Sequence, residues 1–402
     1  MTLDQLRPRL SEELHPVRQS PTVPERCLAG ILESEWWIMS YDQISYRRSF
    51  PWLRLVEAIG IALSLRQLLV AAGATGILML AGAFSGPPIQ TVPPLIVSGW
   101  TISLPKEPST SADILTPRRI DQDFLRPWSA LLEPVLGILS PRADFQDRLL
   151  FGCRGAWRLA VWGLFGLILC RLAARRFTRH EDGSFRKSVQ FGVTRWFQAM
   201  LAPLLPAAAA LLLMIFAVIV ALPGRLPLIG ETLVLLTTPL IVVFSLAAAY
   251  LVIATLLGWP LMVAAIATDD CDGFGGFSRS YSFWTGRSWY FAWCWIVGLI
   301  VGTIALSLAH WLALVTLYFS ELVISVGVGP SPVSKSAGIA ALTIVAFLLR
   351  TFSVSLFWST ATVIYILLRQ SVDKMPLDHS APDDGERDQH EPLPVVGMPA
   401  MQ

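Results

Sequence analysis

The chain has 402 residues, of which 54% are hydrophobic and only 15% are charged, and its mean hydropathy is +0.56. A soluble protein of this composition would have too little polar surface to cover itself, so the apolar excess is expected to face lipid. The formal net charge of +2 gives no case for nucleic-acid binding.

The two ends of the chain differ in composition from its middle. Residues 1–44 contain prolines among charged residues and no early apolar stretch, which predicts a partly disordered cytoplasmic arm without a cleavable signal peptide. Residues 373–402 are charged and rich in proline, which predicts a disordered cytoplasmic tail. We expect the transmembrane domain to occupy residues 45–372.

Long apolar runs punctuate this domain. A hydrocarbon core about 30 Å thick requires roughly 20 mostly apolar residues in a helix, because no water is present to satisfy the backbone. The sequence therefore predicts an all-α, polytopic transmembrane bundle of about six spans. These predicted spans cover residues 67–84, 156–174, 202–222, 233–257, 289–312 and 342–368.

The distribution of basic residues predicts the orientation of the spans. With six spans and both termini inside, 20 Lys and Arg residues fall on the cytoplasmic side and nine on the outer side. Most of those nine lie in the long first loop, where the positive-inside rule has little force. We therefore expect a multi-pass protein of the bacterial inner membrane with both termini in the cytoplasm.

The first external loop is predicted at residues 85–155. Its proline-rich first part excludes regular helix, and an amphipathic piece from Trp128 to Leu139 predicts a short helix that lies on the membrane or caps the bundle. Tryptophans near the predicted span ends resemble an aromatic belt at the headgroup level. These tryptophans are Trp157, Trp196, Trp259, Trp284 and Trp289.

Three apolar runs, 233–268, 289–319 and 337–368, are too long for one straight crossing. In the first, we expect Gly258, Trp259 and Pro260 to kink or break the helix. Residues 261–268 would then form an interfacial or cytoplasmic extension. The other two runs are expected to tilt strongly or to protrude from the membrane.

Two segments that precede predicted hairpins share a Ser-x-x-Phe-x-x-x-Arg pattern, which places the three side chains on one helix face. It predicts amphipathic helices at the inner leaflet, over residues 184–197 and 277–290, with Phe inserted and Arg near the phosphates. The alternative is coincidence, because basic helices flanked by aromatic residues precede many membrane spans. The expected lipid contacts are Phe191, Arg195, Trp196, Phe283, Arg287 and Trp289.

Several stretches carry a resemblance to known proteins, among them SFPWLRL (49–55), VWGLFGLILCRLAA (161–174) and TVIYILLRQSVD (362–373). They resemble an uncharacterised family of bacterial six-span integral membrane proteins, which implies no assigned activity. More distantly, the chain is similar in architecture to the membrane domain of some glycerophosphodiester phosphodiesterases. That similarity implies no catalytic residues, because the active site of those enzymes belongs to a separate barrel domain.

The densest acidic cluster is Asp269, Asp270 and Asp272. Oxygen ligands of this kind suit a divalent cation, but acidic residues before a helix also cap it and complement its dipole, and we favour this second interpretation. Elsewhere, no GxSxG or HExxH motif occurs, and the five cysteines and five histidines are scattered. We therefore predict no enzymatic activity, no cofactor and no metal site.

Two polar residues, His310 and Arg350, interrupt the last two predicted spans at a similar depth. A neutral imidazole can accept a hydrogen bond from a guanidinium, which makes them a candidate intramembrane pair. Alternatively, Arg350 snorkels to the headgroups and the pair does not form. In the same region, Gly298 and Gly302 form a GxxxG motif that predicts close helix packing.

The sequence favours a non-enzymatic membrane protein that organises the membrane or scaffolds partners. Its expected partners are membrane lipids and, in addition, other proteins or further copies of the chain, but not nucleic acid. The alternative is a transporter or lipid-binding permease with a site between helical hairpins. A true repeat of the two pattern segments and their hairpins would favour this alternative. The scarcity of polar residues in the predicted spans counts against it. A polar cavity reaching mid-membrane would distinguish the second from the first.

Overall fold

The computed structural model describes residues 51–84, 95–97, 100–102, 124–139, 144–179, 184–226, 229–329 and 331–373. The described residues from Trp52 onward belong to one compact unit. The predicted arm at 1–44 and the predicted tail beyond Asp373 lie outside the described residues. Nearly all described residues are helical, which confirms the predicted all-α class.

The described elements are helices and one small antiparallel hairpin, whose strands pair Val97 with Trp100. The elements are η2 (Pro51–Val56), α3 (Glu57–Ala62), α4 (Leu65–Phe84), β1 (Leu95–Val97), β2 (Trp100–Ile102), α7 (Arg126–Leu139), α8 (Phe145–Arg179), α9 (Phe185–Ala221), η4 (Leu222–Arg225), α10 (Gly230–Asp269), α11 (Gly273–Gly286), α12 (Ser288–Val328) and α13 (Pro332–Asp373). The amphipathic helix predicted between Trp128 and Leu139 is α7.

Five helices among the described residues are long and apolar enough to cross a membrane, namely α8, α9 with η4, α10, α12 and α13. A sixth candidate joins Pro51–Ala62 to Leu65–Leu80, two segments that are bent by 75° at the break between them. By helix length and hydropathy, the chain is a multi-pass membrane protein with five or six candidate spans. The predicted first span, 67–84, belongs to the bent pair, which is either a broken span or a re-entrant loop.

Of the kink or break expected at Gly258–Pro260, the break is wrong, because α10 continues unbroken from Gly230 to Asp269; the kink stays a prediction. Pro260 has no N–H to donate to the carbonyl of Leu256, one helical turn earlier. The indole N–H of Trp128 in α7 donates to that carbonyl instead, at 2.5 Å. Residues 261–267 are consequently part of the same helix and fully buried in the core, where a separate interfacial or cytoplasmic extension was expected.

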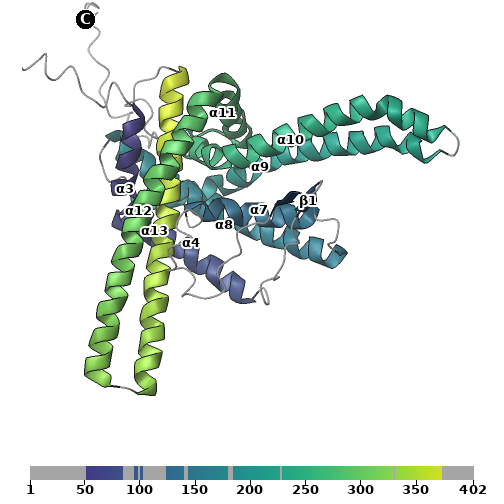
Figure 1. The fold of residues 1–402 in the computed structure, drawn as a ribbon. Coiled ribbons are helices and arrows are strands. Elements are labelled where there is room, and N and C mark those ends of the chain that lie inside the picture. Colours follow the sequence, from purple (N-terminus) through teal and green to yellow (C-terminus); the bar gives the residue numbers. More distant parts are fainter. Residues whose placement is uncertain are drawn as a thin grey trace, which may run out of the picture. The chain divides into compact units, whose positions relative to one another are not determined.

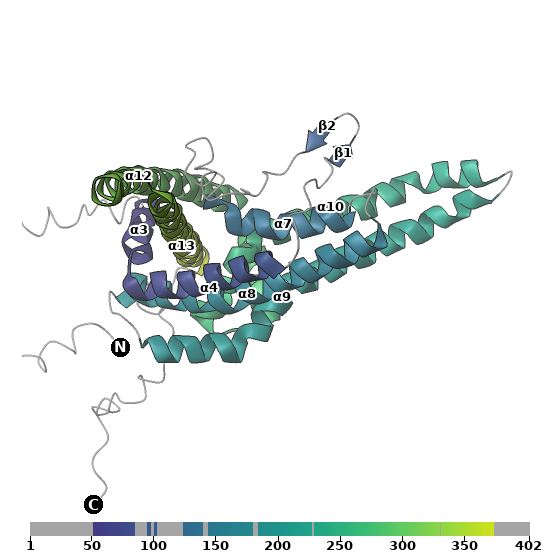
Figure 2. The same cartoon turned by 90° about the horizontal axis from the view of Figure 1, so that it is seen from below.

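The core lies between consecutive stretches of three helices, residues 161–177 of α8, 254–268 of α10 and 353–368 of α13. Figure 2 shows α4, α8 and α13 running past one another in this region. At its centre, the ring of Trp358 lies 5.2 Å from that of Trp259 and 6.1 Å from that of Trp162. Trp259 is therefore a core residue and not a member of the expected aromatic belt.

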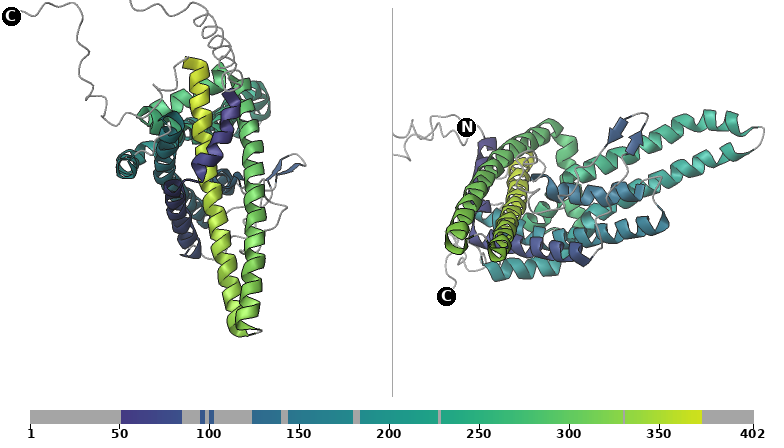
Figure 3. Two further views of the ribbon diagram at one scale, coloured as in Figure 1. Left: turned by 90° about the vertical axis from the view of Figure 1, so that its left-hand side faces the viewer. Right: turned by 60° about the horizontal axis from the view of Figure 1, so that its bottom comes forward.

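Outside the core, the candidate spans form two long helical hairpins. Helices α9 and α10 pair along their length, and so do α12 and α13 (Figure 1). Figure 3 shows the second pair continuing well past the core before it turns. In the most apolar window of α8, 67% of residues are buried, whereas the fraction is 17% in α9 and α10 and 44% in α12 and α13. The distal parts of both hairpins thus present apolar side chains outward.

The close packing predicted for the GxxxG motif of α12 is confirmed. A Cβ atom placed on Gly298 would lie 3.0 Å from Cγ2 of Thr360 in α13. One on Gly302 would lie 2.5 Å from Cε2 of Phe124, the buried residue just before α7. Side chains larger than hydrogen would separate α12 from these two neighbours.

Candidate functional site

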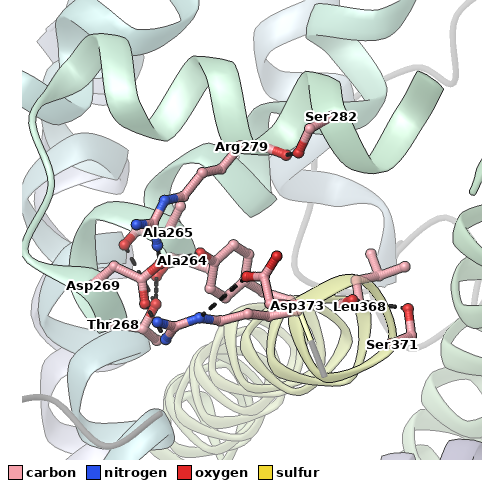
Figure 4. Close-up of polar contacts among 11 residues, drawn as sticks. Ala264, Ala265, Thr268, Asp269, Arg279, Ser282, Leu368, Ser371 and Asp373 are labelled. Atoms are coloured by element: carbon pink, nitrogen blue, oxygen red, sulfur yellow. Dashed lines mark hydrogen bonds and ion pairs between the residues drawn. The ribbon is translucent and has the colours of Figure 1, made fainter. Parts of the chain in front are cut away.

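The most concentrated set of polar contacts surrounds Asp269, the last residue of α10. Its carboxylate is 2% exposed and forms ion pairs with the guanidinium groups of Arg279 in α11 and Arg369 in α13. The hydroxyl of Tyr365, also in α13, donates to the same carboxylate at 2.5 Å. Figure 4 shows Asp269 and Arg279 pointing toward one another from their two helices. We call Asp269, Arg279, Tyr365 and Arg369 the polar junction.

The polar junction joins the two hairpins at their base, because α10 belongs to one hairpin and α13 to the other. Two cations and a hydroxyl surround one carboxylate, and Arg369 also lies 3.8 Å from the carboxylate of Asp373. A buried carboxylate held in this way is stabilised in its ionised form. The Asp269 carboxylate already accepts from the donors around it, so it is not free to act as a catalytic base. Its contacts fix α10, α11 and α13 relative to one another.

The other two acidic residues of the cluster have separate structural roles. Asp272 is the N-cap of α11, where its carboxylate accepts a hydrogen bond from the Gly275 N–H at 2.8 Å. This confirms the predicted helix cap. Asp270 adopts the left-handed conformation that ends α10, with φ of 51°, and pairs with Arg195 of α9 at 2.9 Å. Within the described ranges, no three His, Cys, Asp or Glu side chains are placed to hold a metal ion.

Cys271 lies between these two aspartates. Burial raises the pKa of its thiol to about 11, and the nearby carboxylates of Asp272 and Asp270 act in the same direction. A backbone hydrogen bond and the positive charge of Arg195 oppose the shift but are outweighed. The thiol is therefore neutral at physiological pH, so Cys271 lacks the thiolate character of a nucleophilic cysteine.

The expected lipid contacts in the first segment lie on α9, which begins at Phe185 and runs on into the hairpin without a separate interfacial helix. The guanidinium of Arg171 lies 3.8 Å above the ring of Phe191. Trp196 is partly exposed and donates from its indole N–H to the carbonyl of Ala160. Arg195 is held by Asp270, as described above. Lipid contact by this segment remains a prediction.

The second segment does form a separate helix, α11, but Phe283 lies inside the protein. It is 2% exposed, and its ring centroid is 5.6 Å from that of Tyr365. Its side chain therefore contacts the core where an inserted lipid contact was expected. Arg287 is exposed between α11 and α12, and Trp289 at the start of α12 is 86% exposed. These two residues are free to reach the surroundings.

His310 and Arg350 lie in the α12–α13 hairpin, beside the small apolar cluster of Ala313, Ala346 and Leu349. His310 is buried, and its Nδ1 lies 2.8 Å from the Leu306 carbonyl. Contact with a carbonyl requires a proton on Nδ1, which leaves Nε2 as an acceptor in the neutral ring. Arg350 is partly buried. Their pairing remains a prediction.

From the sequence, Asp269 was interpreted only as part of an acidic cluster, and Arg369 was not predicted to contact it. Their association could not be read from spacing, because Asp269 and Arg369 are 100 residues apart and meet only after α10 and α13 pack together. The one feature of the sequence that could have indicated this ion pair is the position of Asp269 and Arg369 at the same end of two predicted spans.

Comparison of the chain with models of protein families, with curated proteins and with solved structures finds no match. The resemblance to an uncharacterised bacterial family and the architectural similarity to phosphodiesterase membrane domains therefore remain expectations from the sequence.

Proposed function

We propose that this protein is a non-enzymatic membrane protein that organises the membrane or scaffolds partner proteins through its two helical hairpins. The supporting observation is the outward apolar surface of those hairpins. On α10, Leu246 is 70% exposed, and on α12, Leu308 is 66% exposed. Surfaces of this kind contact lipid, partner proteins or a second copy of the chain.

The composition of the α9–α10 hairpin supports its exposure to lipid. Between Trp196 and Asp269 the only charged residues are Arg225 and Glu231, which lie at or near the turn. At 1.5 Å per residue, the 40 residues of α10 extend about 60 Å, roughly twice the thickness of the hydrocarbon core. The distal part of each hairpin is thus long enough to cross the bilayer while the polar junction lies beyond it.

We further propose that both termini are cytoplasmic and that the compartment is the bacterial inner membrane. This orientation depends on the bent pair Pro51–Ala62 and Leu65–Leu80. If the pair is one broken span, the count is even and the termini lie on the same side. If it is re-entrant, the five remaining spans place them on opposite sides. Reporter fusions after Gln370 and within the first 44 residues distinguish the two arrangements.

Extraction of the full-length protein from its native membrane into polymer-bounded discs, followed by mass spectrometry of proteins and lipids, tests the scaffold role. We expect a partner protein or a second copy at a fixed ratio. This association should weaken when exposed hairpin residues become polar, in Leu211→Ser and Leu246→Ser. The matched control is Leu149→Ser, an exposed position outside the hairpins. A single chain that retains one tightly bound solute or lipid would instead indicate the transporter or permease.

A further inference from the structure

Helix α8 differs from α9, α10 and α12 in the length of its uncharged run. Only 12 residues separate Arg158 from Arg171, and they extend about 18 Å as a helix. A hydrocarbon core about 30 Å thick requires roughly 20 residues, and a run of this shorter length is typical of a buried core helix. The uncharged runs of the other three helices are much longer, namely 196–224, 232–268 and 288–320.

The short run of α8 is also hidden inside the protein. None of residues 159–170 is exposed. The ring of Trp162 packs beside that of Trp358 in α13, and a Cβ atom placed on Gly166 would lie 2.8 Å from the same ring. Protein atoms therefore cover the apolar run of α8, so no lipid is needed to bury it.

The exposed half of α8 carries charges. Residues 145–158 are mostly exposed or half-buried, and exposed apolar side chains such as Leu149 alternate there with charged ones. Charged side chains are costly in hydrocarbon, so this half of the helix is unsuited to contact with lipid tails. Its charged residues are Asp147, Arg148, Arg154 and Arg158.

The two hairpins, in contrast, extend far enough beyond the main core to cross a bilayer. Each of their four helices continues for at least 19 residues past the residues that pack in this core, which is about 28 Å or more. Apart from Arg350, next to the core, the charged residues in these parts lie toward the turns. The four parts are 203–221 of α9, 230–256 of α10, 307–328 of α12 and 332–351 of α13.

The distribution of basic residues agrees with this division. If only the hairpins cross the bilayer, Arg225 and Lys335 at the two turns are the only Lys and Arg residues beyond it, against nine in the six-span arrangement. The positive-inside rule counts Lys and Arg within about 20 residues of a span end. It therefore applies to Arg148, Arg154 and Arg158, which precede the apolar run of α8 and favour a cytoplasmic position for this half of the helix.

We propose that the surface in contact with bilayer hydrocarbon is confined to the two hairpins, and that α7, α8 and the main core lie on the cytoplasmic side with the polar junction. This arrangement rests on the proposed membrane role, and it specifies which surface enters the membrane. Without α8, four crossings remain. A re-entrant bent pair is then compatible with two cytoplasmic termini.

The native Cys153, which is exposed in the charged half of α8, reports the side on which this helix lies. The full-length protein in sealed membrane vesicles of either orientation is treated with a membrane-impermeant maleimide, and peptide mass spectrometry identifies the modified cysteines. We expect modification of Cys153 in inverted vesicles, whose cytoplasmic face is outward. In right-side-out vesicles, Cys153 should react only after detergent is added.

Three variants provide the references for each side. Arg225→Cys and Lys335→Cys, at exposed positions near the two turns, should be modified in right-side-out vesicles. Ser282→Cys, exposed on α11 near the polar junction, should be modified in inverted vesicles only. Modification of Cys153 in intact right-side-out vesicles would overturn the cytoplasmic position of α8. Modification of the two turn cysteines in inverted vesicles alone would instead contradict the proposed membrane role, because the hairpins would then not cross.

Discussion

The indole N–H of Trp128 donates a hydrogen bond to the carbonyl of Leu256, the group that Pro260 leaves without its helical donor. Trp128 lies in α7, so this bond connects α7 to the C-terminal half of α10. It also explains how α10 contains a proline without breaking: the lost intrahelical bond is replaced from outside the helix.

We predict that Trp128→Phe destabilises the protein by about 1–3 kcal/mol, because the Leu256 carbonyl becomes a buried acceptor without a donor. Phe preserves most of the ring contact with Trp295. In a Pro260→Ala background the helix regains its own N–H, so the same substitution should cost clearly less. The free energy of unfolding in detergent is measured for the wild type, the two single variants and the double variant. If Trp128→Phe costs the same with and without Pro260→Ala, the explanation is refuted.

The polar junction predicts a large effect of neutralising Asp269. Asp269→Asn leaves Arg279 and Arg369 without their carboxylate, which costs about 3–5 kcal/mol for fully buried pairs. We expect the lower value, about 3 kcal/mol, since Arg279 is 42% exposed. Tyr365→Phe should cost about 1–2 kcal/mol. The control is Tyr318→Phe, an exposed ring on α12; a junction variant no less stable than this control would contradict the role.

The raised pKa of Cys271 predicts slow alkylation at neutral pH. The thiolate is the reactive form, so the iodoacetamide rate at Cys271, followed by peptide mass spectrometry, should keep rising with pH toward about 11. In the unfolded protein the midpoint should return to the ordinary value of 9.0. The thiol ionises at lower pH in the unfolded protein than in the folded protein. The contribution of the buried, neutral Cys271 thiol to folding stability is therefore complete below pH 9 and is lost as the pH rises from 9 to about 11. A folded-state midpoint near 9 would show that the thiol is solvated.

The orientation of the His310 ring predicts coupling with Arg350. With the Nδ1 proton directed at Leu306, Nε2 can accept from the guanidinium. A double-mutant cycle with His310→Leu and Arg350→Leu should therefore give a coupling energy on the order of 1–3 kcal/mol, and Arg350→Lys should not restore it. Additive effects of the two substitutions would mean that Arg350 snorkels independently.

Hydropathy was sufficient to predict the five long apolar helices, because an apolar run of 20 residues has few alternatives in lipid. It could not predict that α10 passes through Pro260, since the replacement donor, Trp128, lies 128 residues away. Nor could it predict that Phe283 packs on Tyr365 while Trp289 remains exposed. Phe283 and Trp289 belong to the same aromatic pattern in the sequence, and only the position of α13 in the fold makes one buried and the other exposed. The polar junction depends on tertiary packing in the same way.

We expect the outward apolar surfaces of the hairpins to lie in the hydrocarbon of a membrane. Spin labels at Leu246 on α10 and Leu308 on α12, in protein reconstituted into bilayers, test it through collision with oxygen, which partitions into lipid, and with a water-soluble nickel chelate. The control label replaces Leu306, which is fully buried and should be shielded from both reagents. We predict high collision with oxygen and little with the chelate at Leu246 and Leu308. High collision with the chelate at these two positions would place the hairpins in water and contradict their insertion in the membrane.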